Sequence, residues 1–200
     1  PKRSPSTGCM SRIALFGGSF NPPHCAHQLV ALYVLETCEI DELWFVPTFV
    51  HPFGKDLVGY EDRVAMCELV VAALGPRAKV SRAEEQLAHQ PGFVTSRTLD
   101  LVEMLHAQRP GDGFRLVIGG DILTETHKWY RWDDLAKLAP PIVIGRSGHA
   151  LPPGAQETGI VMPEISATHA RALLAARDPQ AAGLLPRSIL RYIADRGLYG

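Results

Sequence analysis

Short apolar runs alternate with helix-like stretches along this chain, and the alternation limits its fold more than any other feature. Most of the runs contain too few polar residues for a half-exposed strand and fit strands buried on both faces. The runs are residues 13–16, 43–46, 78–80, 114–118, 142–144 and 159–162. Strands separated by helices in this way form a parallel sheet with helices on both faces. The expected fold class is therefore α/β, with a single doubly wound parallel sheet.

Helical spacing of apolar residues appears between most of these runs. The first helix follows the prolines at 22–23 and includes residues 29–34, and others are predicted at about 61–74, 96–107, 168–176 and 187–195. Right-handed crossovers place every strand-to-helix loop at one edge of the sheet, where a binding site is expected. Residues 1–11 lack apolar periodicity and are expected to form a flexible N-terminal tail, with 12–200 as a single domain.

Charge and composition exclude several functional classes. The 20 Lys and Arg against 21 Asp and Glu leave a net charge of -1, so no overall basic field exists for nucleic acid. No apolar run approaches the roughly 18 residues that a membrane span needs, and residues 1–12 do not fit a secretory signal. The 4 cysteines contain no CxxC pair and fit reduced thiols. We therefore expect a cytoplasmic protein with neither a nucleic acid nor a membrane as partner.

The most informative segment is the loop after the first apolar run. Gly17 and Gly18 follow a buried strand, so the backbone can approach a ligand closely with its N–H groups, and the next helix presents its positive end to an anion. His24 and His27 lie three residues apart at the start of that helix, so both rings share one face. The loop therefore predicts a phosphate site with two imidazole donors.

Other nucleotide and metal sites can be tested against the same segment. The chain contains no GxxxxGK[ST] sequence, and the loop is not GxGxxG, so a P-loop and a dinucleotide-binding oxidoreductase are disfavoured. A zinc site would need a third ligand beside the two histidines, and Cys25 points away from their shared face. A packing role for one histidine remains as the simple alternative.

Four blocks of sequence resemble one enzyme family. Residues 17–27, GGSFNPPHCAH, resemble the GGxFxPxHxGH signature of nucleotidyltransferases with a His-x-Gly-His element. Residues 118–121, 129–135 and 165–171 resemble the IGAD, WxxW/IxxL and ISSTxIR blocks of bacterial nicotinate-nucleotide adenylyltransferases, in the same order. The resemblance covers roughly residues 12–196. It implies a Rossmann-like nucleotidyltransferase fold and adenylyl transfer from ATP to nicotinate mononucleotide.

That reaction requires no general base, because the attacking phosphate oxygen is already an anion. Catalysis reduces to aligning two polyanions and neutralising charge on the phosphoryl oxygens. The catalytic residues are therefore expected to be His24, His27, Lys55 and Arg171. The residues expected around ATP are Phe16, Gly17, Gly18, Ser19, Phe20, His24, His27, Ser166, Thr168 and Arg171. ATP is expected to bring Mg²⁺ with it, held by phosphates and water, so no metal ligands are assigned.

The second substrate is expected to contact residues from later loops. These are Lys55, Thr98, Gly119, Asp121 and Trp129. Trp129 offers a flat face to the pyridine ring, with Trp132 facing the core, and Asp121 can accept hydrogen bonds from ribose hydroxyls at a strand end. Thr98 would help to bind the pyridine carboxylate.

Some positions leave the interpretation open. Ala26 replaces the glycine of the family motif, and Ala167 replaces a serine of ISST. Taken alone, residues 166–171 also fit a well-capped surface helix, and Lys55 fits a solvated lysine. The alternatives are a pantetheine-phosphate adenylyltransferase or cytidylyltransferase, and an inactive nucleotide-binding regulator. Whether the chain forms a homo-oligomer is left open.

Overall fold

A computed structural model describes residues 10–50, 57–123, 125–146, 157–163 and 165–200. Most of the expected N-terminal tail and the expected catalytic Lys55 lie outside these residues. The side chain of Asp121 is likewise outside the described part.

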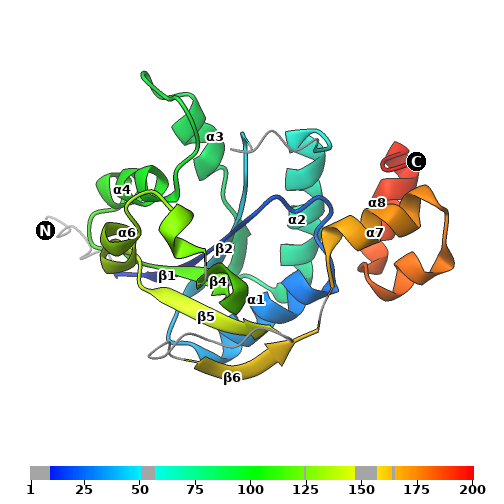
Figure 1. The fold of residues 1–200 in the computed structure, drawn as a ribbon, viewed down its shortest axis with the longest axis horizontal. Coiled ribbons are helices and arrows are strands. Elements are labelled where there is room, and N and C mark those ends of the chain that lie inside the picture. Colours follow the sequence, from blue (N-terminus) through cyan, green and yellow to red (C-terminus); the bar gives the residue numbers. More distant parts are fainter. Residues whose placement is uncertain (1–9, 51–56, 124, 147–156, 164) are drawn as a thin grey trace, which may run out of the picture.

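Six parallel strands form one sheet in the order β3-β2-β1-β4-β5-β6 (Figure 1). The strands are β1 (Arg12–Gly18), β2 (Glu42–Pro47), β3 (Ala78–Val80), β4 (Gly113–Gly119), β5 (Pro141–Arg146) and β6 (Glu157–Met162). Every neighbouring pair is parallel. The doubly wound α/β sheet predicted from the apolar runs is therefore confirmed, and the strand order reverses between β1 and β4.

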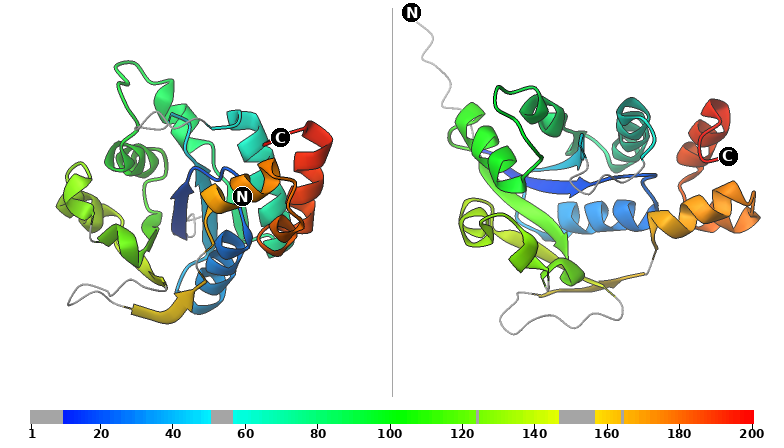
Figure 2. Two further views of the ribbon diagram at one scale, coloured as in Figure 1. Left: turned by 45° about the vertical axis from the view of Figure 1, so that its right-hand side comes forward. Right: turned by 45° about the horizontal axis from the view of Figure 1, so that its top comes forward.

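Helices cover both faces of this sheet (Figure 2). They are α1 (Cys25–Thr37), α2 (Tyr60–Leu74), α3 (Ala83–Ala88), α4 (Thr98–Gln108), α5 (Gly120–Leu123), α6 (Trp132–Leu138), α7 (Ala167–Ala175) and α8 (Arg187–Arg196), with 3₁₀ turns at Thr126–Lys128 and Pro179–Gly183. The five helices expected from apolar spacing are α1, α2, α4, α7 and α8, each within two residues of its expected ends where these were stated. The shorter helices were not predicted.

Alternate residues of the central strands enter two separate cores. Ala14 and Phe45 belong to the cluster shared with α1, α2, α7 and α8. Ile13 and Trp44 belong to the cluster shared with α3, α4 and α6. This period of two explains why the strands read as continuous apolar runs, because each face of the sheet needs its own apolar row. Among the described residues, no helix has the length and apolarity to cross a membrane.

Candidate active site

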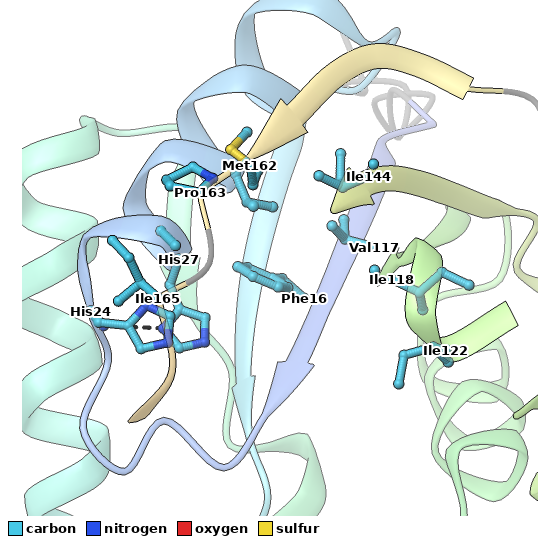
Figure 3. A pocket seen from close by; sticks show the side chains of 14 residues that line it. Phe16, His24, His27, Val117, Ile118, Ile122, Ile144, Met162, Pro163 and Ile165 are labelled. Carbon is cyan, nitrogen blue, oxygen red and sulfur yellow. Dashed lines mark hydrogen bonds between the residues drawn. The ribbon is translucent and has the colours of Figure 1, made fainter. Parts of the chain in front are cut away.

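A cavity of about 210 Å³ opens at the carboxyl edge of the sheet, where the strand order reverses (Figure 3). Ligands of open α/β sheets bind at such a reversal. Four strands contribute to its walls, namely β1, β4, β5 and β6. The start of α1, the short helix α5 and the segment before α7 complete them. The residues that line it are Phe16, His24, Ala26, His27, Val30, Val117, Ile118, Gly119, Ile122, Ile144, Gly145, Met162, Pro163 and Ile165. The walls are mostly apolar, and the two histidines form their main polar group.

The two histidines lie against each other at the start of α1. Their rings are stacked, with centroids 3.7 Å apart, and His24 is only 5% exposed. The backbone N–H of His24 donates to Nδ1 of His27 at 3.1 Å. Since that nitrogen accepts a hydrogen bond, a neutral His27 ring carries its proton on Nε2, which is then the nitrogen that donates. The predicted shared face is confirmed, and both rings line the cavity (Figure 3).

Aromatic packing fixes the orientation of His27. The Phe20 ring lies 5.0 Å from the His27 ring, and the Phe16 ring lies 5.8 Å from it. Phe20 is buried in a left-handed backbone conformation, with φ of 46°. A Cβ at Gly18 would lie 3.2 Å from Cζ of Phe20, so a side chain there would press on the Phe20 ring. A Cβ at Gly17 meets no protein atom within 4 Å, so its small size leaves room at the sheet edge.

Asn21 connects the first loop to three distant segments. Its buried Oδ1 accepts hydrogen bonds from the Tyr199 hydroxyl at 2.7 Å and from the backbone N–H of Val58 at 3.3 Å. Its backbone oxygen accepts one from Nη1 of Arg171 at 2.7 Å. Burial raises the pKa of Tyr199, so its hydroxyl remains the donor. The loop is therefore held from the α2, α7 and α8 sides at a single residue.

The segment before α7 forms the capped helix start that its sequence allowed, and it contacts the first loop. Ser166 is the N-cap of α7, and its Oγ accepts a hydrogen bond from the backbone N–H of His169 at 3.1 Å. Arg171 donates from Nη2 to Oγ1 of Thr168 at 3.3 Å, besides its bond to Asn21. The helix is thus properly capped, and it also delivers a guanidinium to the loop that carries the histidines.

Arg63 is a residue of this region that the sequence interpretation missed. It is 2% exposed, and its guanidinium donates to the backbone oxygens of Ser19, Thr48 and Val58. Desolvation lowers its pKa. The sequence did contain a sign of this role. Arg63 lies three residues before Met66 and seven before Val70, and this helical spacing places its charge on the inner, apolar face of the helix.

The expected contacts of the second substrate are only partly brought together. Gly119 lines the cavity, whereas Thr98 and Trp129 do not. Trp129 and Trp132 are both half-buried, lie edge to face at 5.7 Å and pack against the same core cluster. The expected division, with only Trp132 facing the core, is therefore not seen, because Trp129, at the end of the 3₁₀ turn, packs edge to face against Trp132 at the start of α6.

Thr98 is the first residue of α4. The loop before it is anchored by the buried carboxylate of Glu84. Glu84 of α3 accepts a hydrogen bond from Oγ of Ser96, and burial raises the pKa of this carboxyl group. The loop that leads to Thr98 is thereby tied to α3, beside the end of β3.

The thiol beside the histidine pair is not activated. Cys25 is half-buried, and burial raises its pKa. Its backbone N–H donates to the oxygen of Leu184 at 2.9 Å. In the part of the chain that the structure describes, no group of three His, Cys, Asp or Glu side chains could hold a metal ion.

Comparisons with known proteins agree with this architecture. Residues 15–173 match the cytidylyltransferase-like family. The chain is 48% identical over 187 residues to a probable nicotinate-nucleotide adenylyltransferase from Anaeromyxobacter sp. (strain K), covering 94% of this chain and 96% of the relative. A protein of the same name from Myxococcus xanthus (strain DK1622) is 37% identical over 189 residues, covering 94% of this chain and 95% of the relative.

Solved structures share the fold. The Plasmodium falciparum nicotinic acid mononucleotide adenylyltransferase complexed with NaAD superposes with a TM-score of 0.79 at 20% identity, covering 94% of this chain and 97% of that chain. A complex of the same enzyme with APC gives a TM-score of 0.78 at 19% identity, with the same coverage of both chains. By its sequence relatives and the family it matches, the chain is a nucleotidyltransferase and belongs to the nicotinate-nucleotide adenylyltransferase family.

Proposed function

We propose that this protein transfers the adenylyl group of ATP to nicotinate mononucleotide, giving deamido-NAD and pyrophosphate in NAD biosynthesis. The observation that carries the proposal is the stacked His24 and His27 pair, which lines a cavity at the reversal of strand order. The sequence relatives that bear the name of this activity align with this chain over nearly their whole length. ATP is taken as its magnesium complex, with the metal on the phosphates.

The chemistry needs positioning and charge neutralisation. A phosphate oxygen of nicotinate mononucleotide attacks the α-phosphorus of ATP, and a new P–O bond forms there. The bond from that phosphorus to the bridging oxygen breaks, and its electron pair leaves with pyrophosphate. The attacking oxygen is an anion at neutral pH, so no proton has to be removed. Donors aimed at the oxygens that gain charge account for most of the acceleration in reactions of this type.

The polar groups around the cavity suit those roles. Nε2 of His27 donates toward phosphate, and the glycine loop supplies space for the triphosphate beside it. Arg171 adds a guanidinium from α7, with Ser166 and Thr168 at the start of that helix. The apolar walls from β4 and β5 suit a planar purine. Lys55, Thr98, Asp121 and Trp129 remain proposed contacts of the pyridine nucleotide.

Trp129 provides a test of the second-substrate assignment. We expect Trp129→Ala to raise the KM for nicotinate mononucleotide by about 10-fold, because stacking on an aromatic ring is worth roughly 1–3 kcal/mol per base. The KM for ATP should change little. Steady-state kinetics with each substrate varied separately measures the difference. Trp132→Ala is the matched comparison, and an equal rise in KM in both variants would contradict a ligand role special to Trp129.

Ala26 tests the departure from the family motif. Its side chain is buried and lines the cavity. We expect Ala26→Gly to keep or raise kcat, because it only removes a methyl group from the cavity wall. The same change should lower the free energy of unfolding by about 1 kcal/mol, since glycine is unfavourable within a helix. Thermal unfolding and turnover measured together separate the two effects, and a sharp loss of turnover would show that the loop requires alanine.

Pyrophosphate release tests the proposed function directly. The protein is assayed with ATP and nicotinate mononucleotide, nicotinamide mononucleotide or pantetheine phosphate, and with CTP in place of ATP. We expect release with ATP and nicotinate mononucleotide above the other pairs. Preference for pantetheine phosphate or for CTP would favour a sister transferase. Binding of ATP without release would favour an inactive nucleotide-binding regulator.

A further inference from the structure

Arg63 is a buried cation whose described hydrogen bonds all go to backbone oxygens, and its Cζ lies 5.4 Å from the centroid of the Tyr60 ring. Its Nη1 donates to the oxygens of Ser19 at 2.9 Å and Thr48 at 2.8 Å, and its Nε donates to the oxygen of Val58 at 3.1 Å. The described ion pairs include no carboxylate partner for it. A buried charge without such a partner is costly, and desolvation accordingly lowers the pKa of Arg63. Because the ordinary pKa of arginine is so high, the side chain stays charged.

The three acceptors belong to two different loops. Ser19 lies in the glycine loop after β1, whereas Thr48 and Val58 lie at the two ends of the segment between β2 and α2. A planar guanidinium can serve acceptors in several fixed directions at once, which an ammonium group cannot do with the same geometry. Arg63 therefore fixes the two loops at the sheet edge relative to each other.

The bond to Ser19 also fixes the next peptide. The Ser19–Phe20 peptide is trans, because the only cis bond in the described residues is Asn21–Pro22. In a trans peptide the C=O and N–H groups point in opposite directions. Holding the Ser19 oxygen toward Arg63 therefore directs the N–H of Phe20 away from it and sets the backbone from which the Phe20 ring packs on His27.

We propose that Arg63 is a positioning residue for adenylyl transfer, which acts by holding the Ser19 carbonyl and thereby the Phe20 and His27 geometry. This inference rests on the proposed function. Arg63 does not line the cavity, so its effect on the reaction runs through the loop. Small misplacements of groups around a transferring phosphoryl group are expensive, because catalysis there depends on alignment.

Chemical rescue tests the proposal. Arg63→Ala is expected to lower kcat/KM for ATP by about 10- to 100-fold, the cost of a roughly 1 Å misplacement. Millimolar methylguanidinium, which can fill the vacated guanidinium position, should restore a large part of that loss. Methylammonium at the same concentration should not. Circular dichroism and thermal unfolding are recorded under each condition, so that turnover is compared for folded protein.

Two further variants keep the test decisive. Arg63→Lys retains the positive charge but lacks the planar set of guanidinium donors, so we expect its kcat/KM for ATP to fall below the wild-type value. This variant serves as the test if Arg63→Ala does not fold. Arg77→Ala removes an exposed arginine that pairs with Glu36, and wild-type kinetics are expected. Wild-type kcat/KM in folded Arg63→Lys, or a methylguanidinium effect on Tm with none on kcat/KM, would overturn the proposal. If the wild-type protein releases no pyrophosphate, the proposed function itself has failed instead.

Discussion

His27→Ala is expected to lower kcat by about 100- to 1000-fold, the usual cost of removing one donor from a site that stabilises developing charge. His24→Ala should cause a loss of similar order, because the His24 ring also lines the cavity and is stacked on the His27 ring. Pyrophosphate release under saturating substrates measures kcat. The protein should remain folded, since Ala31 and Val34, which anchor α1 in the core, are fully buried and are unchanged.

The matched control is His89→Ala. His89 is an exposed histidine at the end of α3, a helix that packs on the opposite face of the sheet from α1, and it does not line the cavity. Its removal is expected to leave kcat near the wild-type value. Near-normal kcat in both His24→Ala and His27→Ala would falsify the proposed site. A large loss in only one of them would assign the donor role to that ring and a packing role to the other.

The fold was predictable wherever a segment was long and apolar enough to show its period. The apolar runs at β1, β2, β4 and β5 were visible because a strand buried on both faces needs apolar residues on both. Helix α3 has 6 residues and α6 has 7, too short for a helical period to separate from chance. Arg131, which precedes α6 in a left-handed conformation with φ of 50°, gave no sequence signal of a helix start.

The site was predictable only where its residues are close in sequence. His24 and His27 are three residues apart, so the helix geometry alone places their rings together. Arg63 reaches Ser19 across 44 positions, and Tyr199 reaches Asn21 across 178. No local pattern indicates such pairs, since they arise from how α2 and α8 pack beside the sheet edge. The sequence therefore indicated the histidine pair that lines the cavity, while the contacts that hold the loop from behind became visible only in the structure.

Arg171→Ala is expected to lower kcat/KM for ATP by about 100- to 1000-fold, because an arginine that clamps phosphate oxygens is worth several kcal/mol in a site shielded from water. The structure adds a second reason for the loss. The guanidinium holds the backbone oxygen of Asn21, so its removal also frees the loop that carries the histidines. Initial-rate kinetics with ATP varied at saturating nicotinate mononucleotide measures the change.

Arg171→Lys separates charge from geometry at this position. Lysine keeps the positive charge but cannot hold both the Asn21 oxygen and Thr168 Oγ1 with the arginine fork. An intermediate kcat/KM is expected, because the phosphates still meet a cation from α7 while the loop that carries the histidines is held less firmly. Arg191→Ala, an exposed arginine of α8, serves as the control with wild-type kinetics. If Arg171→Ala itself retained wild-type kcat/KM, α7 would be a capped helix that supports the fold, and the triphosphate would need its cations from elsewhere.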